Sequence, residues 1–559
     1  MREEYIELME RVLSAYSDEH ISSYFEHVKA DGLREHGFPR LTANIGILIS
    51  FGKRRDLLPL FIEMMEFCCR SIPFVKAAND FSVREIVCCI EAISEAGVVE
   101  PEIISNWKAM LSKIDPQKCY NVIADTPKSD VHNWALFTGV SEIYRKSMLG
   151  EDINEFIEIQ LASQVKWVDK LGMYQDYGKV RNPVLYDIVS RMLFSLALSR
   201  GYKGRYFKKI NALLKKGGIS TLAMLSVSGE IPYGGRSNQF LHNEASVCTI
   251  LEFEAARYRK VGDLEKAKLF DKARAAAISS LCSYLDEQPI SHVKNRYPID
   301  SMIGCEGYAY FDKYMITTAS NLYVAYLISD GEDKEPLAGP YELAESAEVF
   351  KTTKHFHKVF MRSGEYCAEI DTNADFRYDS SGLGRLHRKG APSAIAISHP
   401  CPEHPKFRIK STDRMPLAVC PALCVEGELA TASNEAHDKI LKLSKCGERA
   451  IAKIKHKIGE RSAVATYELT SAGLSVTAYG ESTAILIPAF YFDGKEHAEI
   501  SAKECSLTVS YRGWKCVWQT DGVIEDLCRT SANRNGIYKA FAARSSGTLV
   551  SVKVKIEKL

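Results

Sequence analysis

The spacing of apolar residues changes near the middle of this chain. In residues 6–16 apolar side chains recur three or four positions apart, which places them on one face of a helix. In residues 550–557 they alternate strictly with polar ones, as in a strand with one buried and one wet face. The sequence therefore predicts a helical first part and a β-stranded second part.

The helical pattern recurs along the first part of the chain. Stripes of the same kind occupy residues 56–72, 83–96, 129–149, 155–167, 183–198, 245–261 and 264–285. Short breakers such as Gly97 and Gly201 separate them. Short connections of this kind favour antiparallel helix hairpins packed side by side.

A charged segment with prolines, residues 331–342, precedes the change of period. This composition is typical of a loop or linker. Beyond it, alternating runs such as residues 463–470 and 474–479 are joined by short turns, as in a β-sandwich. We therefore expect an α+β multidomain chain, with a helical domain over residues 1–335 and an antiparallel β-sandwich over residues 336–559.

Charge and composition exclude several classes of partner. The 559 residues carry 72 basic and 71 acidic side chains, for a net charge of +1. This balance offers no basic face for nucleic acid or for a membrane surface. No apolar run approaches the roughly 20 residues that span a bilayer. The first residues lack the features of a secretory signal, and the sixteen cysteines are scattered, so we expect a cytoplasmic protein.

One polar loop, residues 231–244, contains the largest group of candidate functional side chains. A Gly234-Gly235 pair allows a tight turn that could aim its side chains into a cleft. Such a set of donors and acceptors suits a hydroxylated, anionic ligand, although a polar connector that caps the next helix is the alternative. The candidate residues are Arg236, Asn238, Gln239, His242, Asn243 and Glu244.

A second stretch, residues 296–314, contains a cluster of tyrosines beside Glu306. Tyr310 and Tyr314 are four apart, so they share a helix face, and Glu306 lines up with Tyr310. Together with Tyr308 they are typical of a cleft wall, because each buried hydroxyl would need a partner. Aromatic packing is the alternative for any one of them.

Weaker candidates lie in three other places, where such residues more often have a structural than a functional role. They are His132, Asn133 and Trp134; Tyr174, Asp176 and Tyr186; and Arg385 and His387. His399, Cys401 and His404 lack the paired spacing of a zinc site. No nucleotide-binding fingerprint occurs either. We therefore expect neither a metal nor a cofactor.

Helical hairpins followed by a β-sandwich resemble the heparinase II/III-like polysaccharide lyases and related oligoalginate lyases, which combine an (α/α) toroid with a β-sandwich. The local resemblance lies in Asn238 and His242, in residues 306–310, and in the Asn133-Trp134 pair. The family often has adjacent Asn-Asn-His, whereas residues 237–242 here read Ser-Asn-Gln-Phe-Leu-His. The neutralising residue and the choice between Tyr308 and Tyr310 therefore stay open.

The resemblance implies β-elimination in uronic-acid-containing oligosaccharides, by an exo-acting enzyme. Arg236, Asn238 or His242 would neutralise the carboxylate, and Tyr308 or Tyr310 would transfer the proton. Arg236 and His242, or Arg385 and His387, would lower the pKa of that tyrosine. The remaining candidates would bind substrate: Gln239, Asn243, Tyr314, His132, Asn133, Trp134, Tyr174, Asp176 and Tyr186.

Two other functions remain open on the sequence. A glycoside hydrolase would need two carboxyl groups flanking the bond, for which Glu244 and Glu306 are the candidates, with Asp176, Asp187 and Asp300 in reserve. A non-catalytic protein would bind an acidic glycan without cleaving it. Each alternative is compatible with a homo-oligomer.

Overall fold

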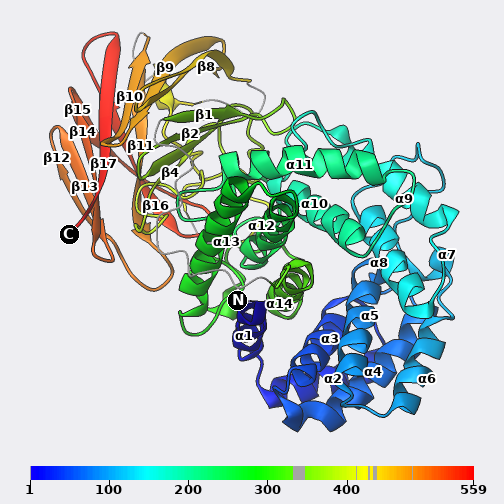
Figure 1. Cartoon of the computed structure of the whole chain (residues 1–559). Coiled ribbons are helices and arrows are strands. Elements are labelled where there is room, and N and C mark those ends of the chain that lie inside the picture. Colours follow the sequence, from blue (N-terminus) through cyan, green and yellow to red (C-terminus); the bar gives the residue numbers. More distant parts are fainter. Residues whose placement is uncertain (1, 332–346, 411, 426–427, 432–436, 481–482) are drawn as a thin grey trace.

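The computed structural model describes residues 2–331, 347–410, 412–425, 428–431, 437–480 and 483–559. A helical toroid is followed by an antiparallel β domain, which confirms the predicted fold class (Figure 1). The predicted boundary at residues 335/336 lies outside the described residues. In the described part of the chain, no helix combines the length and apolar character needed to cross a membrane.

Fourteen α-helices account for the toroid in the described ranges. They are α1 (Arg2–Leu13), α2 (Asp18–Asp31), α3 (Gly37–Ser50), α4 (Leu58–Ser71), α5 (Asn79–Ala96), α6 (Pro101–Leu111), α7 (Pro116–Cys119), α8 (Trp134–Leu149), α9 (Glu155–Val165), α10 (Val184–Ser199), α11 (Phe207–Met224), α12 (His242–Lys260), α13 (Leu264–Leu285) and α14 (Phe311–Ile328).

Six of these helices form a closed inner ring. α3, α5, α8, α10, α12 and α14 each pack on the next, and α14 packs back on α3. α4, α9, α11 and α13 lie outside them, and α1 packs on α14. Burial follows this arrangement: α3 is buried along nearly its whole length, whereas α2 buries only one stripe. A helix enclosed on both sides needs an apolar surface all round.

The described residues of the β domain form three antiparallel sheets. Its strands are β1 (Glu348–Lys351), β2 (Lys358–Ser363), β3 (Tyr366–Asp371), β4 (Gly382–Arg388), β5 (Pro421–Val425), β6 (Glu428–Ala430), β7 (Lys439–Cys446), β8 (Arg449–Ile458), β9 (Arg461–Thr470), β10 (Gly473–Tyr479), β11 (Thr483–Phe492), β12 (Glu499–Lys503), β13 (Ser506–Tyr511), β14 (Trp514–Thr520), β15 (Val523–Ala532), β16 (Ile537–Arg544) and β17 (Leu549–Lys558). The sheet orders are β1-β2-β3-β4, β12-β13-β14-β17-β10-β9-β8-β7 and β15-β16-β11-β5-β6.

The large sheet carries the period-two pattern seen in the sequence. β17 and β8 alternate between buried and exposed residues, and β9 and β10 form the predicted hairpin. The five-stranded and four-stranded sheets both contact this large sheet, so the buried faces share one core. β2 and β3 are buried along their whole length, because their other side faces the toroid.

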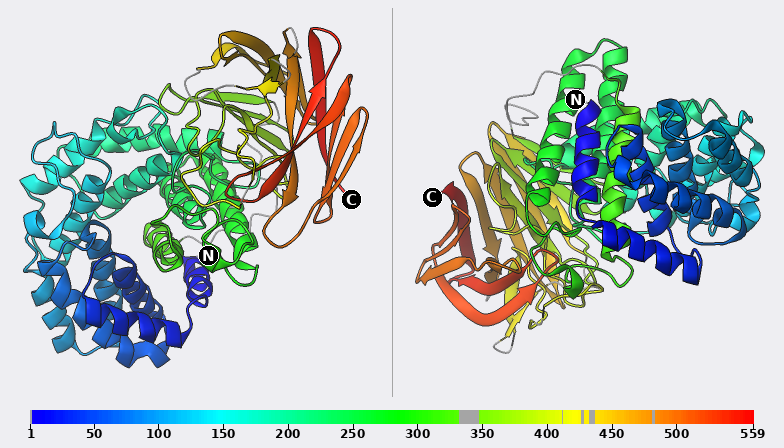
Figure 2. Two further views of the ribbon diagram at one scale, coloured as in Figure 1. Left: turned by 180° about the vertical axis from the view of Figure 1, so that it is seen from behind. Right: turned by 90° about the horizontal axis from the view of Figure 1, so that it is seen from below.

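The β domain lies against one side of the toroid, beside α11, α12 and α13 (Figures 1 and 2). Toroid loops reach across this boundary: Arg385 Nη1 in β4 donates to Ile231 O at 2.9 Å, and Arg296 N donates to Asp493 O at 3.0 Å. Gly304 N donates to Arg408 O at 2.8 Å. The polar loop of residues 231–244 is therefore held by both domains.

Candidate functional site

The first turns of the inner helices gather at one mouth of the ring. The ring of His36, just before α3, lies 4.7 Å from Phe81 in α5, and Phe81 lies 4.8 Å from Trp134 at the start of α8. His242 begins α12, and its ring lies 5.1 Å from Tyr314 in the first turn of α14. Helix N-termini attract negative charge, so this mouth suits an anionic ligand.

Residues 236 and 237 contact both the start of α10 and the tyrosines at the start of α14. The Arg236 guanidinium lies 5.0 Å above the ring of Tyr186 in the first turn of α10. Ser237 Oγ lies 3.1 Å from the hydroxyl of Tyr308 and 3.3 Å from that of Tyr314. The polar loop and the tyrosine cluster, which are about 70 residues apart in sequence, thus meet directly.

The polar loop adopts an unusual backbone. Gly234, Gly235, Ser237 and Gln239 all have positive φ, at 144°, 76°, 59° and 66°. Two of these residues are not glycine, and such conformations persist only where surrounding contacts enforce them. A Cβ at Gly235 would lie 2.8 Å from the Cα of Pro183, so the predicted glycine turn also allows a close approach to α10.

Glu306 supplies the main contact that holds this backbone. Its Oε1 accepts a 2.7 Å hydrogen bond from Ser237 N. Arg534, in the turn between β15 and β16, binds both oxygens of Glu306, at 2.6 and 3.1 Å. Both side chains are buried. A two-bonded ion pair of this kind fixes geometry as well as charge, so the β domain anchors the loop.

The loop amides predicted to bind substrate serve the loop itself. Asn238 Nδ2 donates to Pro232 O at 3.1 Å, and Gln239 Nε2 donates to Asn238 Oδ1 at 2.7 Å. Asn243 Oδ1 accepts from Phe240 N at 3.1 Å. All three amide side chains are buried. In this conformation they support the loop and do not reach the mouth.

Arg236 and Tyr308 are both open to solvent. Tyr308 is 41% exposed, and Arg236 is exposed as well. Burial of its ring raises the pKa of Tyr308 to about 12, Glu306 adds to this, and Ser237 and Arg236 oppose it. Tyr308 is therefore protonated at neutral pH and able to donate.

Tyr310, unlike Tyr308, lines a cavity away from Arg236. It lines a space of about 550 Å³ together with His20, Tyr24 and Asp312, at the end of α2. The Lys313 ammonium lies 4.8 Å from its ring. Of the two tyrosines left open by the sequence, Tyr308 is the one beside Arg236.

His242 and Glu244 lie beneath the loop. His242 is buried between Phe240 and Tyr314, and burial lowers its pKa to about 3, so the ring is neutral. Glu244 is fully buried and forms a 2.5 Å ion pair with Lys294. Neither group is open to a ligand at the mouth.

Four of the five carboxyl groups considered for hydrolysis are engaged elsewhere. Glu244 is paired with Lys294, Glu306 with Arg534, and Asp187 with Arg191 at 2.6 Å. Asp176 is buried and accepts from Asn133 N at 2.9 Å and from the Tyr174 hydroxyl at 3.1 Å. Asp300 is exposed in a short 3-10 turn.

The early candidates divide into lining and supporting residues. Asn133 and Tyr174 are buried around Asp176. His132 is half-buried, with its ring 5.2 Å from Trp134 and 5.9 Å from Tyr177. Burial lowers the pKa of His132 overall; Asp176 and Asp80 oppose this, and the charge of Arg236 adds a smaller lowering effect. His132 is therefore neutral and belongs to the same mouth as Arg236.

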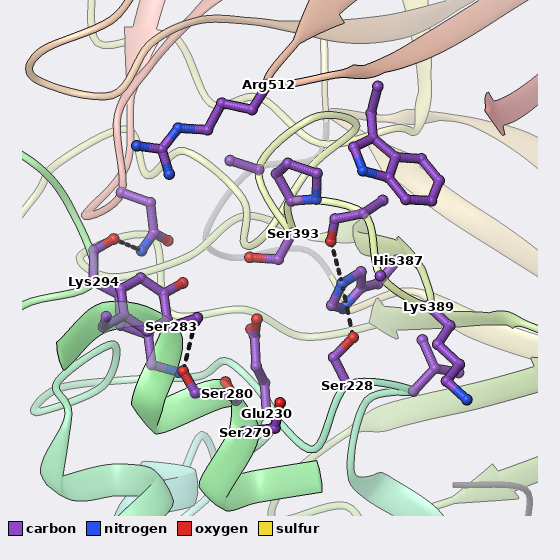
Figure 3. A pocket seen from close by; sticks show the side chains of 18 of the residues that line it. Ser228, Glu230, Ser279, Ser280, Ser283, Lys294, His387, Lys389, Ser393 and Arg512 are labelled. Atoms are coloured by element: carbon purple, nitrogen blue, oxygen red, sulfur yellow. Dashed lines mark hydrogen bonds between the residues drawn. The ribbon is translucent and has the colours of Figure 1, made fainter. Parts of the chain in front are cut away.

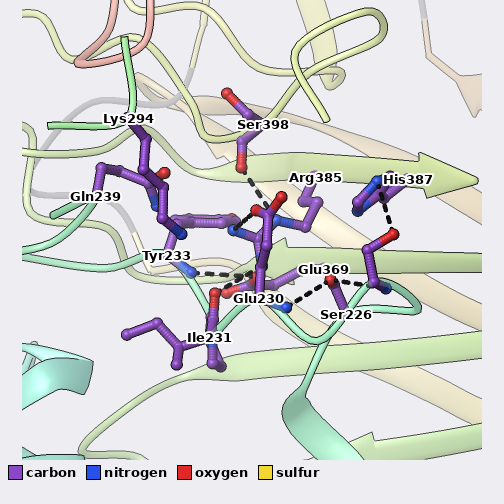
Figure 4. Close-up of polar contacts among 12 residues, drawn as sticks. Ser226, Glu230, Ile231, Tyr233, Gln239, Lys294, Glu369, Arg385, His387 and Ser398 are labelled. Carbon is purple, nitrogen blue, oxygen red and sulfur yellow. Dashed lines mark hydrogen bonds and ion pairs between the residues drawn. The ribbon is translucent and has the colours of Figure 1, made fainter. Parts of the chain in front are cut away.

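Arg385 and His387 do not reach the tyrosines. Both are buried in β4, behind the loop (Figure 4). Arg385 donates to Ile231 O and pairs with Glu369 at 3.4 Å, and His387 Nε2 donates to Ala391 O at 3.0 Å. The expectation that these cations lower the tyrosine pKa is not met in the structure. Arg236 is the cation that opposes the rise in the pKa of Tyr308.

The β domain contributes residues that the sequence did not single out. Besides Arg534, Asp379 accepts a 2.8 Å hydrogen bond from Gly235 N, and burial raises its pKa to about 7. Tyr378 lies close enough to Arg236 to raise the pKa of that guanidinium, against the effect of burial. A polar Asn-Arg-Asn-Gly turn at residues 533–536 was the available signal, but nothing local connects it to residue 306.

The residues considered for zinc are dispersed. His399 is buried and its Nε2 accepts from Arg534 N at 3.0 Å, whereas His404 is exposed beside Glu403. Within the described ranges, no three His, Cys, Asp or Glu side chains lie together so that they could hold a metal ion. All sixteen cysteines are free thiols.

No protein-family model matches this sequence, and no curated protein matches it significantly. The structure is similar to a mutant chondroitin AC lyase from Streptomyces coelicolor A3, with 10% identity and a TM-score of 0.49 over 99% of this chain and 82% of that one. A mutant heparan sulfate lyase from Pedobacter heparinus gives 9% identity and a TM-score of 0.32, over 89% of this chain and 76% of the lyase. A family 88 glycosyl hydrolase from Bacteroides vulgatus gives 10% identity and a TM-score of 0.38, over 59% of this chain and 99% of the hydrolase. At such identities and TM-scores, none of these likenesses assigns an activity to the chain.

Proposed function

We propose that this protein is a lyase that cleaves acidic oligosaccharides by β-elimination at the mouth of the toroid. The observation that carries the proposal is the exposed pair of Arg236 and Tyr308, joined through Ser237 and surrounded by helix N-termini. A cation beside a protonated phenol, at a positive mouth, suits a substrate that carries both a carboxylate and a leaving oxygen.

The difficult step of this reaction is removal of a weakly acidic proton next to a carboxylate. Arg236 would bind that carboxylate and stabilise the charge that develops on it in the transition state. The helix N-termini at the mouth would add to this stabilisation. The loop backbone is already held by Glu306 and Asp379, so Arg236 needs little reorganisation on binding.

His132 and Tyr308 would carry out the proton transfers, and the charge of Arg236 acts to lower the pKa of both groups. Neutral His132 would accept the ring proton, the carbon–oxygen bond would break, and Tyr308 would protonate the leaving oxygen. A proton returned from His132 to Tyr308, through solvent, restores both groups. With a pKa of about 12, Tyr308 is better suited to donate than to accept at neutral pH.

The test is to incubate the protein with uronate oligosaccharides and identify the new end group. An unsaturated uronate, seen by ultraviolet absorbance and mass spectrometry, is the expected product. Arg236→Ala should lower kcat/KM by about a hundredfold, since it removes a charge-assisted contact of the transition state. Lys268→Gln, on the outer face of α13, is the matched control and should retain activity.

Saturated products would identify a glycoside hydrolase instead and would overturn the lyase proposal. The structure favours hydrolysis less, because Glu244 and Glu306 are both buried in ion pairs. Binding without any cleavage of a broad set of uronate glycans would identify a glycan-binding protein.

A further inference from the structure

A second cavity lies between α13 and the β domain, behind the polar loop (Figure 3). Its volume is about 680 Å³, within the range of small-molecule sites. Glu230 and Lys294 line it from the toroid, and His387 and Trp514 line it from the β domain. Its lining includes neither Arg236 nor Tyr308, so it is separate from the mouth described above.

We propose that this cavity binds one small acidic saccharide, a uronate of one or two sugar units. The proposal rests on three features of the wall: a buried carboxylate, a set of hydroxyl and aromatic groups, and two lysines that form no ion pair with the described residues. It does not depend on the proposed lyase reaction.

The buried carboxylate belongs to Glu230. Its Oε2 lies 3.7 Å from Arg385 Nη2 but accepts no hydrogen bond from the described residues, and the side chain is 4% exposed. Burial opposes ionisation, but the nearby Lys294 and Arg385 cations hold the pKa of Glu230 at about 2. Because Arg385 lies beyond hydrogen-bond distance, this ionised carboxylate can still accept a hydrogen bond from a ligand. Ligand hydroxyl groups would supply that hydrogen bond.

Hydroxyl and aromatic side chains make up much of the remaining wall. Ser228, Ser279, Ser280, Ser283 and Ser393 line the cavity, and all five are labelled in Figure 3. Tyr284 and Trp514 add aromatic surface at the same cavity. Hydroxyl groups that both donate and accept, set beside apolar ring faces, match the mixed polar and apolar surface of a sugar.

The lysines indicate the charge of the ligand. Arg512 is paired with Glu287 at 2.7 Å, and Arg296 with Glu287 at 3.1 Å. Lys272 and Lys389 line the same cavity and form no ion pair with the residues that the structure describes. A bare anion would satisfy these lysines but not Glu230, and a neutral sugar would do the reverse. A uronate satisfies both.

Occupancy of this cavity would act on residues that hold the polar loop. Lys294 lines the cavity and pairs with Glu244, two residues after His242. Asn535 also lines the cavity and follows Arg534, the partner of Glu306. A bound saccharide would therefore contact the back of the support on which Arg236 sits.

The experiment measures binding of glucuronate by calorimetry to Arg236→Ala, in which the mouth is impaired. We expect one saturable site with a dissociation constant in the millimolar range or lower. Adding Lys272→Gln and Lys389→Gln should weaken that binding by about tenfold, the effect of losing charged hydrogen bonds. Adding Lys268→Gln, on an exposed part of the same helix, should leave it unchanged. Glucose and sulfate should each bind more weakly than glucuronate.

No saturable binding of glucuronate to Arg236→Ala would overturn the proposal. So would binding that is unaffected by the two lysine changes, or sulfate that binds as well as glucuronate. Because Arg236→Ala removes the mouth contact, these results are independent of whether the protein is a lyase. Circular dichroism of each variant separates loss of binding from loss of folding.

Discussion

Arg534 and Glu306 form a buried, two-bonded ion pair across the domain boundary, with distances of 2.6 and 3.1 Å. The two residues are 228 positions apart in sequence. Because Glu306 also accepts from Ser237 N, this pair connects the β domain to the backbone beside Arg236. The β domain is thus part of the support of the candidate site.

Replacing Arg534 by alanine should both destabilise the protein and impair the site. The change leaves Glu306 buried without its cation, which costs about 3–5 kcal/mol. Chemical denaturation measures this loss in the free energy of unfolding. Arg529→Ala, at an exposed position of β15, is the control and should cost less than about 0.5 kcal/mol. Equal stability of the two variants would contradict the role of the ion pair.

Tyr308→Phe and Tyr310→Phe should behave differently although both remove one hydroxyl. Tyr308 touches Ser237 beside Arg236, whereas Tyr310 lines the cavity near α2. Loss of the acid should lower kcat by at least about a hundredfold in Tyr308→Phe, with a smaller change in KM. Tyr310→Phe should retain near-normal kcat. The reverse pattern would move the reaction to the other cavity.

The acid limb of the activity profile should report His132. Burial and Arg236 lower its pKa, so the neutral base is present above that lowered value and is lost as pH falls through it. An NMR titration should show a His132 pKa below the usual value of about 6.5. Arg236→Gln should raise it, because the opposing charge is removed. No change in this variant would mean that the two groups are not coupled.

Asp379→Asn should change the pH dependence of stability. Burial raises the pKa of Asp379 to about 7 in the folded protein, so the folded state holds its proton longer than the unfolded one. This contribution to stability is full below the unfolded pKa and is lost as pH rises to about 7. The variant keeps an acceptor for Gly235 N, so its stability relative to wild type should increase between pH 5 and 7 by about 1.4 kcal/mol per pH unit. Urea unfolding at several pH values measures this difference, and parallel pH curves would contradict it.

Gly235→Ala should cost more than Gly262→Ala. The two glycines have similar φ values, 76° and 78°, so the backbone penalty of a side chain is shared. A Cβ at Gly235 would lie 2.8 Å from the backbone of Pro183, whereas a Cβ at Gly262 would meet open space. We expect Gly262→Ala to cost about 1 kcal/mol and Gly235→Ala at least twice that. Thermal unfolding compares them, and equal costs would mean that the loop moves away from α10 freely.

Short-range sequence patterns were enough to predict the helices, the hairpins and the glycine turn. The stripe in residues 245–261 became α12, and the alternation in residues 550–557 became β17, because each pattern depends on neighbours within a few residues. They also sufficed to select the two stretches that meet at Ser237. The roles of individual residues within those two stretches could not be predicted from such short-range patterns.

Long-range packing separated residues that look equivalent in the sequence. Tyr308 and Tyr310 are two positions apart, yet Tyr308 contacts Ser237 whereas Tyr310 lines the cavity near α2. Asn238 and Gln239 turned inward, and Arg236, not Arg385, is the cation that opposes the rise in the pKa of Tyr308. The partner of Glu306, Arg534, lies 228 positions away, and no local periodicity encodes such a contact.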